Sequence, residues 1–338
     1  MLDAMRVLIL GGTGLISVGI VKHLLARGAD ITVFNRGLRD ASQMPKGVKA
    51  LVGDRNELEI FERRFAGEHF DAVIDMIAFS PGQAMSDVRA FGGRCTHFLF
   101  CSTVCTYGVK IPSSVVIDES FAQEPISEYG RNKLACERII LDAQRGGAFM
   151  ATVIRPSSTY GPGSPLIDQL EFNPIAWDRI AKGEPVLVAD DGLGLWNSTH
   201  RDDVGKLFAY AALNAKTYGK SYNATTQRVF TWRDYYREVA AALGTTAKLI
   251  SMPADWIVNR DAKRFNLLAE ITRHHGPYTS AAAMADVPEF VCEIDFTTGA
   301  KQTVDDLKRR GALRVGADPA YDAMVADAMA LGSKARDA

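Results

Sequence analysis

The sequence lacks the features that mark several special classes of protein. No apolar run reaches the ~18 residues that a membrane-spanning helix needs, so a membrane protein is not expected. Net charge is nearly absent, because 39 lysine and arginine residues stand against 40 aspartate and glutamate residues and leave a charge of −1. This balance argues against a general polyanion binder and hence against nucleic acid as a partner. The first residues show no signal-peptide layout.

Cysteine is scarce and badly spaced for a structural role. The chain has five cysteines, an odd number, and no pair has the two-residue spacing of a zinc or redox motif. His274 and His275 are adjacent, but neighbouring histidines on a loop rarely converge on a metal without a third ligand. We therefore expect no metal site and no disulfide framework, and we expect a reducing, cytoplasmic location.

Short apolar runs alternate with amphipathic stretches in the first half of the chain, which predicts an α/β fold with a Rossmann-like, doubly wound parallel sheet. The expected strands are residues 6–10, 31–34, 48–52, 71–75, 97–101 and 151–154. After Pro156 the short mixed elements indicate a smaller, mixed α/β domain. We expect a dinucleotide-binding domain over residues 1–165 and about 199–225, and a substrate domain over 166–198 and 226–330.

A glycine-rich turn follows the first expected strand. Residues 11–17 read Gly-Gly-Thr-Gly-Leu-Ile-Ser, and glycines there let the backbone approach a pyrophosphate that faces the next helix N-terminus. Ser17 takes the place of the third glycine, which is a mild departure from the usual pattern. Because the turn joins a strand to a helix, it indicates a dinucleotide site rather than a plain structural turn. The expected cofactor contacts are Gly11, Thr13, Gly14, Leu15 and Ile16.

The end of the second expected strand favours NADP over NAD. NAD sites usually have an acidic residue ~20 positions past the glycines, whereas here Asn35 is followed by Arg36 and Arg39. Asparagine removes a carboxylate that would repel a 2′-phosphate, and guanidinium groups pair well with phosphate. NAD stays an alternative, because arginines in a solvated loop need no ligand. Further contacts are expected from Asp54 at the adenine, and from Ala78 and Phe79 beside the nicotinamide.

Three side chains are candidates for catalysis. Tyr129 and Lys133 stand four residues apart, which places them on one face of a helix. The lysine cation and an oxidised nicotinamide would lower the pKa of Tyr129 from its ordinary value of about 10 and favour a phenolate base. Ser102 and Thr103 end a strand that should point at the same cleft, where Thr103 would hydrogen-bond the reacting oxygen. We therefore take Tyr129, Lys133 and Thr103 as the catalytic residues.

The motifs described so far resemble those of the extended short-chain dehydrogenases/reductases of the NAD-dependent epimerase/dehydratase family, which includes UDP-glucose 4-epimerase. Residues 155–163 resemble the stretch that meets the cofactor carboxamide and crosses to the substrate domain. The resemblance implies hydride transfer between the nicotinamide and a substrate carbon, with Tyr129 handling the hydroxyl proton. It also implies a homodimer. The cofactor contacts that it adds are Ser102, Tyr129, Lys133, Pro156 and Ser158, and Tyr160 joins Thr103 as a substrate contact.

The leading functional interpretation is an NAD(P)-dependent epimerase, or related epimerase/dehydratase, acting on a sugar or sugar nucleotide through a keto intermediate. In the family that this chain resembles, an arginine usually binds the substrate diphosphate. It stands four residues before a histidine that corresponds here to His200. That arginine is replaced by Trp196, which is placed to stack on the substrate instead. An NADPH-dependent carbonyl reductase on a non-nucleotide substrate is therefore an alternative, and an RNA-binding member of the same fold without catalysis is a minor one.

Overall fold

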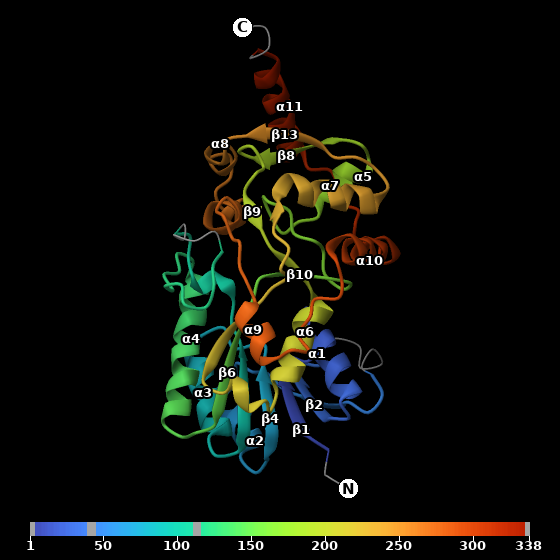
Figure 1. Cartoon of the computed structure of the whole chain (residues 1–338). Helices are drawn as coiled ribbons and strands as arrows, with labels where there is room; N and C mark the ends of the chain where they lie inside the picture. The colour runs from blue at the N-terminus through green and yellow to red at the C-terminus, as the bar shows by residue number, and fades with distance from the viewer. Residues whose placement is uncertain (1–3, 39–44, 111–115, 335–338) are drawn as a thin grey trace. The chain divides into compact units, whose positions relative to one another are not determined.

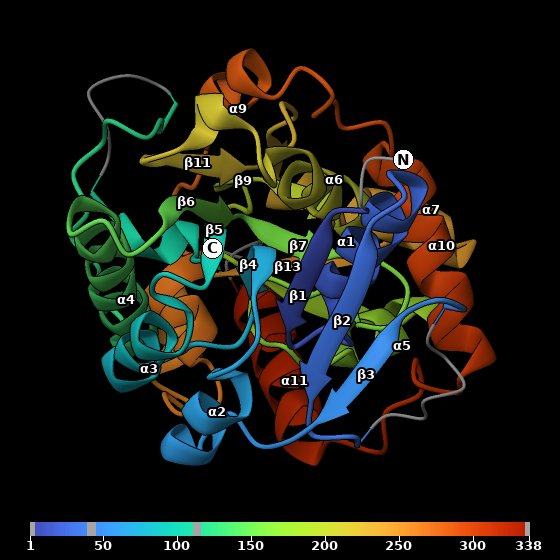
Figure 2. The ribbon, with the colours of Figure 1, turned by 90° about the horizontal axis from the view of Figure 1, so that it is seen from below.

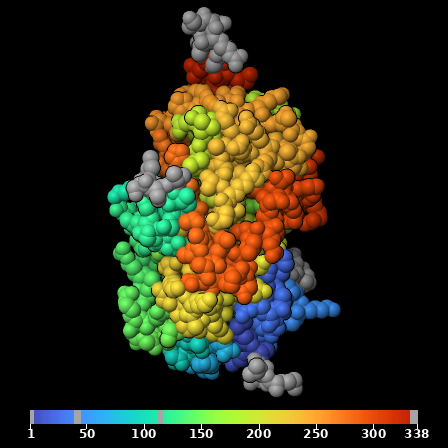
Figure 3. Space-filling view, in the orientation of Figure 1, coloured from blue at the N-terminus to red at the C-terminus, as the bar shows by residue number. Residues whose placement is uncertain are grey.

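The computed structural model describes residues 4–38, 45–110 and 116–334 and divides into two units. The first unit holds Met1–Thr159, Thr199–Gln227 and Tyr278–Glu293, and the second holds Tyr160–Ser198, Arg228–Pro277 and Ile294–Ala338. The sequence had placed all of 226–330 in the substrate domain, whereas residues 278–293 pack in the first unit. There α9 (Ala281–Asp286) lies beside β11 (Lys220–Ala224), and its orange surface adjoins yellow surface of the same unit (Figures 1 and 3).

In the described residues, the first unit is built on a seven-stranded parallel sheet with the order β11-β6-β5-β4-β1-β2-β3 (Figure 2). Its other strands are β1 (Arg6–Leu10), β2 (Asp30–Asn35), β3 (Lys49–Val52), β4 (Phe70–Asp75), β5 (Cys95–Cys101) and β6 (Met150–Pro156). This is the doubly wound sheet that the apolar runs predicted. Of the strands in this sheet, β11 is the one that the sequence analysis did not predict.

Helices cover both faces of the sheet because alternate strand residues point to opposite sides. Val7 and Ile9 of β1 belong to the core shared with α1 and α6, whereas Leu8 and Leu10 belong to the core shared with α2, α3 and α4. The helices of the first unit are α1 (Leu15–Ala26), α2 (Leu58–Phe65), α3 (Pro81–Phe91), α4 (Glu128–Arg145), α6 (Arg201–Ala211) and α9, with short 3₁₀ turns at Val104–Thr106 and Ala215–Thr217.

Helices α1 and α6 approach each other closely through two glycines. A Cβ atom on Gly19 would lie 2.5 Å from the carbonyl oxygen of Arg201, and one on Gly205 would lie 2.4 Å from the carbonyl carbon of Gly19. No side chain fits at either contact, so these glycines set the distance between the helices. The close packing of α1 near the glycine turn therefore does not require a glycine at position 17, where the chain has serine.

The second unit is smaller and has an aromatic core. Its helices are α5 (Ile175–Ala181), α7 (Trp232–Leu243), α8 (Ala254–Val258), α10 (Phe296–Arg309) and α11 (Pro319–Lys334), with a π-helical turn at Leu268–Thr272. Its strands are β8 (Pro185–Ala189), β9 (Leu195–Trp196), β12 (Phe230–Thr231) and β13 (Lys248–Met252), and β7 (Ser158–Tyr160) and β10 (Ser198–His200) contain unit boundaries. Trp232, Tyr235 and Tyr236 of α7 are fully buried, as expected for an amphipathic helix with its rings inward.

None of the helices in the described ranges is both long and apolar enough to cross a membrane.

Candidate active site

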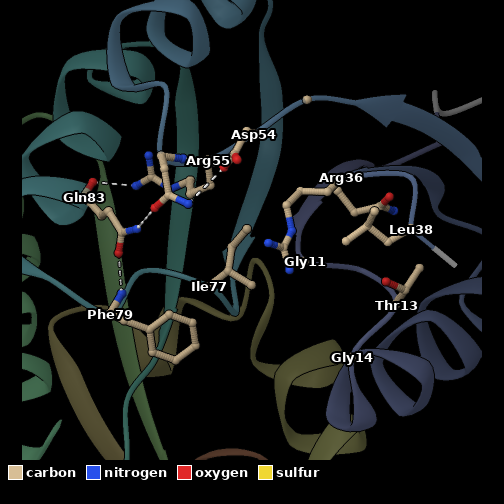
Figure 4. A pocket seen from close by; sticks show the side chains of 13 residues that line it. Gly11, Thr13, Gly14, Arg36, Leu38, Asp54, Arg55, Ile77, Phe79 and Gln83 are labelled. Carbon is tan, nitrogen blue, oxygen red and sulfur yellow. Dashed lines mark hydrogen bonds between the residues drawn. The ribbon is translucent and has the colours of Figure 1, made fainter.

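Two adjoining cavities lie at the carboxyl ends of the strands of the first unit. The first, of about 490 Å³, is lined from the ends of β1, β2, β3 and β4, and the second, of about 410 Å³, from the ends of β1, β4, β5 and β6. Gly11, Gly14, Ile77 and Phe79 line both, so the two cavities form one groove across the glycine turn. Figure 4 shows the first cavity. Open α/β sheets bind their ligands at this edge.

The glycine turn fits a pyrophosphate. Gly11 has φ +86°, and a Cβ atom there would lie 2.4 Å from Ile77 Cγ2, so a side chain would both strain the backbone and clash. Gly14 caps α1 without a side-chain acceptor, so the first N–H groups of the helix have no cap and face the groove through Leu15 and Ile16. Ser17 Oγ donates to the Gly11 carbonyl oxygen at 2.8 Å and ties the helix to the turn.

Most of the residues predicted to bind the adenosine end of the cofactor line the first cavity. Thr13, Asn35, Arg36 and Asp54 all line it. Asn35 Oδ1 accepts a hydrogen bond from Gly37 N at 2.8 Å, which fixes the loop that carries Arg36. In Figure 4 the Arg36 side chain extends into the space between β2 and the glycine turn. The remaining residue predicted there, Arg39, lies outside the described residues.

Lys133 is held at the floor of the second cavity. Its side chain is buried, and Nζ donates to the carbonyl oxygens of Ala78 (2.8 Å) and Cys101 (2.7 Å). The ammonium also lies 4.5 Å from the ring centroid of Phe79 and 4.8 Å from that of Phe100, as in a cation–π contact. Ala78 itself is fully buried and does not line the groove, so it acts here through its carbonyl oxygen.

Tyr129 and Thr103 lie together in the second cavity with Lys133. Burial raises the pKa of the Tyr129 phenol above its ordinary value, and a hydrogen bond with Thr103 offsets part of that rise. The sequence analysis expected the lysine cation to lower the pKa of Tyr129. In this structure the pKa is raised instead, because burial disfavours the charged phenolate. The phenol is therefore protonated at neutral pH in this structure.

Ser102 takes part in a buried network next to the groove rather than offering a free hydroxyl. It donates to Glu137, which also receives two hydrogen bonds from Arg155, at 2.9 and 2.7 Å. Arg155 in turn donates to the Tyr107 hydroxyl at 2.8 Å, and Tyr107 donates to Asn223 Oδ1 at 2.8 Å. Since Glu137 follows Lys133 by one helical turn, the network fixes α4 against β5 and β6.

Other predicted contacts lie in different surroundings. Pro156 lines the second cavity together with Ser157 and Thr159, whereas Ser158 is not among the lining residues. Tyr160 and Trp196 belong to the second unit, where both are buried. Tyr160 packs against Phe296, with ring centroids 5.0 Å apart, and the rings of Trp196 and Trp232 are 4.9 Å apart. His200 caps α6 by accepting from Asp202 N through Nδ1, which gives it a structural role at the start of that helix.

Several residues of the groove were missed by the sequence analysis. Arg55, Asn56 and Gln83 line the first cavity, and they come from the segments that follow β3 and β4. A usable signal existed for Gln83, because Ser80 and Gln83 have the spacing of a capping box, which the structure forms at the start of α3. No sequence pattern singles out Arg55, whose partners are Asp75 and Asp87.

The doubly wound sheet, the glycine turn and the groove with tyrosine and lysine define a nicotinamide-dinucleotide enzyme of the dehydrogenase type. The chain belongs to the NAD dependent epimerase/dehydratase family, whose sequence profile matches residues 83–225. It is 33% identical over 273 residues to 2′-dehydrokanamycin reductase of Streptomyces kanamyceticus, covering 80% of this chain and 76% of the reductase. The resemblance and the enzyme class predicted from the sequence are thereby confirmed.

Two further proteins are similar to this chain, one in sequence and one in fold. Chloroplast stem-loop binding protein of 41 kDa b of Arabidopsis thaliana is 24% identical over 339 residues, with 95% of this chain and 84% of the plant protein covered. The structure of UDP-glucose 4-epimerase from Bifidobacterium longum, in complex with NAD+ and UDP, superposes with a TM-score of 0.73 at 18% identity. That match covers 92% of this chain and 100% of the epimerase, and at this identity it shows the shared fold.

Proposed function

We propose that this protein is an NADPH-dependent reductase that converts a ketone on a sugar or glycoside, not carried by a nucleotide, into the alcohol. The observation that carries the proposal is that Tyr129 and Thr103 line the second cavity together, in the same groove as Arg36. A carbonyl reduction must deliver a proton to the carbonyl oxygen. The raised pKa of Tyr129 keeps that proton on the phenol, so the group starts the reaction as an acid.

The cofactor preference rests on charge at the end of β2. Asn35 and Arg36 line the first cavity where an acidic residue would select a free ribose 2′-hydroxyl. A guanidinium is suited to a phosphate because it forms paired, charge-assisted hydrogen bonds. These two residues support NADP(H) rather than NAD(H) as the dinucleotide of this family member.

The substrate preference rests on what stands where nucleotide-sugar enzymes have an arginine. Trp196 brings no positive charge to that position, and its indole packs on Trp232. A diphosphate without a cationic partner is costly to bury. The name of the reductase relative gives its substrate as 2′-dehydrokanamycin, and this name includes no nucleotide. The relative therefore supports a substrate without a nucleotide for this chain as well.

The reaction assigns one task to each side chain. The nicotinamide, when bound, supplies the hydride that reaches the carbonyl carbon. Tyr129 donates its proton to the carbonyl oxygen, and Thr103 hydrogen-bonds that oxygen as negative charge develops on it. Lys133 uses two of its three N–H donors on Ala78 and Cys101, and we assign the third to the nicotinamide ribose.

A sugar epimerase is the second candidate, because the family whose profile matches this chain is described as one of epimerases and dehydratases. The same trio would act there with Tyr129 as a base first. Incubating the purified protein with NADPH and a panel of ketone-bearing glycosides tests the choice. Loss of the reduced-nicotinamide absorbance in step with alcohol formation supports the reductase. Interconversion of UDP-sugars without net cofactor consumption would instead establish the epimerase.

The cofactor assignment has its own test. Titration with NADPH and NADH should show tighter binding of NADPH, and Arg36→Ala should weaken NADPH about tenfold or more while leaving NADH nearly unchanged. Lys46→Ala, in a neighbouring exposed loop position that lines neither cavity, provides the control. Equal affinities in the wild type, unchanged by Arg36→Ala, would reverse the assignment to NAD. The homodimer expected from the resemblance stays a prediction.

A further inference from the structure

Residues 76–80, which connect β4 to α3, form a wall shared by both cavities. Ile77 and Phe79 line the first and the second cavity alike. The Ala78 carbonyl oxygen between them receives the hydrogen bond of Lys133 Nζ at 2.8 Å. The position of this segment therefore decides where the lysine ammonium is held.

Every backbone N–H of residues 76–80 has a hydrogen-bond acceptor. Met76 N donates to the Leu10 carbonyl oxygen at 3.1 Å, in continuation of the sheet. Asp75 Oδ1 accepts from Ile77 N and Ala78 N, at 2.6 and 3.0 Å. Gln83 Oε1 accepts from the last two N–H groups, at 2.7 Å from Phe79 N and 3.1 Å from Ser80 N. Two side-chain oxygens thus define the shape of the segment.

Arg55 lies between the Asp75 carboxylate and the backbone of Gln83. It is buried, lies 2.7 Å from Asp87 and 3.9 Å from Asp75, and donates to the Gln83 carbonyl oxygen at 2.5 Å (Figure 4). Its guanidinium also stacks on Phe61, 4.1 Å from the ring centroid. Burial and the neighbouring Asp75 carboxylate raise the pKa of Asp87. The cluster is a fixed frame under the segment.

Gln83 is the member of this arrangement that also reaches the groove. Gln83 and Asn56 both line the first cavity, and Gln83 Nε2 donates to Asn56 Oδ1 at 3.0 Å. Figure 4 shows the Gln83 side chain above Phe79, with the hydrogen bond from Phe79 N to Gln83 Oε1. One side chain thus touches the first cavity and holds the backbone that anchors Lys133.

We propose that Gln83 is a positioning residue for Lys133: by accepting from Phe79 N and Ser80 N it holds segment 76–80 in the shape that presents the Ala78 carbonyl oxygen to the lysine ammonium. It does not touch the reacting atoms. The inference depends on the groove being the dinucleotide site of the family, and its effect on turnover depends on the proposed reductase activity. A ligand that fills the first cavity contacts the same side chain and stabilises the same anchor.

The test compares Gln83→Ala with Gln83→Glu by hydrogen–deuterium exchange of the amides of residues 76–80. Alanine removes the acceptor, so exchange at Phe79 and Ser80 should rise about tenfold, the effect of one lost hydrogen bond. Glutamate keeps the acceptor and suits a helix N-terminus, so it should restore slow exchange. Thr231→Ala, which removes the comparable cap of α7 in the second unit, should leave these amides unchanged.

Turnover supplies the readout that a mere helix cap would not move. Gln83→Ala should lower kcat about tenfold with the substrate KM within about twofold, Gln83→Glu should recover kcat, and Thr231→Ala should keep the wild-type value. Faster exchange with unchanged kcat would overturn the positioning role, as would equal exchange in all variants. If wild-type protein reduces no carbonyl, the reductase proposal fails by itself. In that case NADPH protection of amides 76–80, present in the wild type and lost in Gln83→Ala, decides the inference.

Discussion

The two units of this protein bury polar groups for different purposes. In the first unit, buried cations pair with carboxylates or carbonyl oxygens beside the groove: Lys133 with Ala78 and Cys101, and Arg155 with Glu137. In the second unit the core is a cluster of large rings, and one of its buried carboxyls, Asp168, accepts from the nearby backbone N–H groups of Leu170 and Glu171. Buried charge is expensive. The first unit places such groups where they shape the site, whereas those of the second unit, for example Glu171 paired with Arg264, line neither cavity of the groove.

The largest expected effect would show that chemistry belongs to the first unit. Tyr129→Phe should lower kcat about a thousandfold, because it removes the proton donor and leaves the ring in place. Tyr235→Phe removes the same atom from a buried ring of the second unit and should keep kcat within about twofold. Steady-state kinetics with the ketone substrate measures both. A Tyr129→Phe enzyme that kept a tenth of the wild-type kcat would contradict the assigned role.

The second prediction concerns packing in the second unit. Trp232 is fully buried, contacts Trp196 and Tyr235, and donates through Nε1 to the Thr272 carbonyl oxygen at 3.1 Å. Trp232→Ala should lower the free energy of unfolding by about 3–5 kcal/mol through the cavity that it leaves. Urea unfolding measures the loss, while NADPH titration in native buffer should give the wild-type Kd. If a folded Trp232→Ala variant no longer bound NADPH, cofactor binding would not depend on the first unit alone.

The units should also respond to pH in opposite directions. Burial lowers the pKa of His200 in the first unit to about 4, so the unfolded chain binds more protons and stability falls as pH drops from about 6.5 toward 4. Burial, with Glu171 nearby, raises the pKa of Asp168 in the second unit to about 8. There the folded state binds more protons, so this stabilisation is complete below about 3.8 and is lost as pH rises toward 8.

Two conservative variants separate these effects. His200→Asn keeps a cap acceptor for α6 and should reduce the loss of Tm on acidification. Asp168→Asn keeps an oxygen for Leu170 N and Glu171 N and should raise Tm by a few degrees at pH 8.5 relative to the wild type, with little gain at pH 5. Thermal melts across this pH range give the answer. A wild-type and an Asp168→Asn curve that run parallel would show that Asp168 does not titrate as described.

The smallest expected effect tests whether the second unit contributes to substrate binding. Trp196→Phe keeps an aromatic ring against Trp232, so stability should change little. Because this ring is buried against Trp232 and lines neither cavity of the groove, the substrate KM, kcat and the NADPH Kd should all stay within about twofold of the wild type. Phe230→Leu, a change in the same aromatic core, is the control. A KM that rose in Trp196→Phe but not in Phe230→Leu would show instead that the indole contacts the substrate.

The sequence predicted much of the first unit and little of the second. Buried parallel strands are continuous apolar runs, and a glycine turn has few alternative explanations between a strand and a helix, so both could be identified locally. The Tyr129 and Lys133 spacing likewise placed two side chains on one helix. In the second unit, Tyr160 and Trp196 were assigned to the substrate by position, and the structure places both rings in a buried cluster. Aromatic residues pack and bind with the same surface, so sequence alone does not separate these roles.

By itself, the sequence determined the doubly wound sheet and the turn at residues 11–17, and it singled out Thr103, Tyr129 and Lys133 as catalytic candidates, because each signal is a local pattern in the chain. Only the tertiary structure decided what surrounds them. Parallel strands bring Ala78 and Cys101, which are 55 and 32 positions from Lys133, to one ammonium. Burial then raises the pKa of Tyr129, and Gln83 and Asp75 fix the segment that carries Ala78. Desolvation and long-range hydrogen bonds arise from the order of strands in the sheet, which no local pattern records.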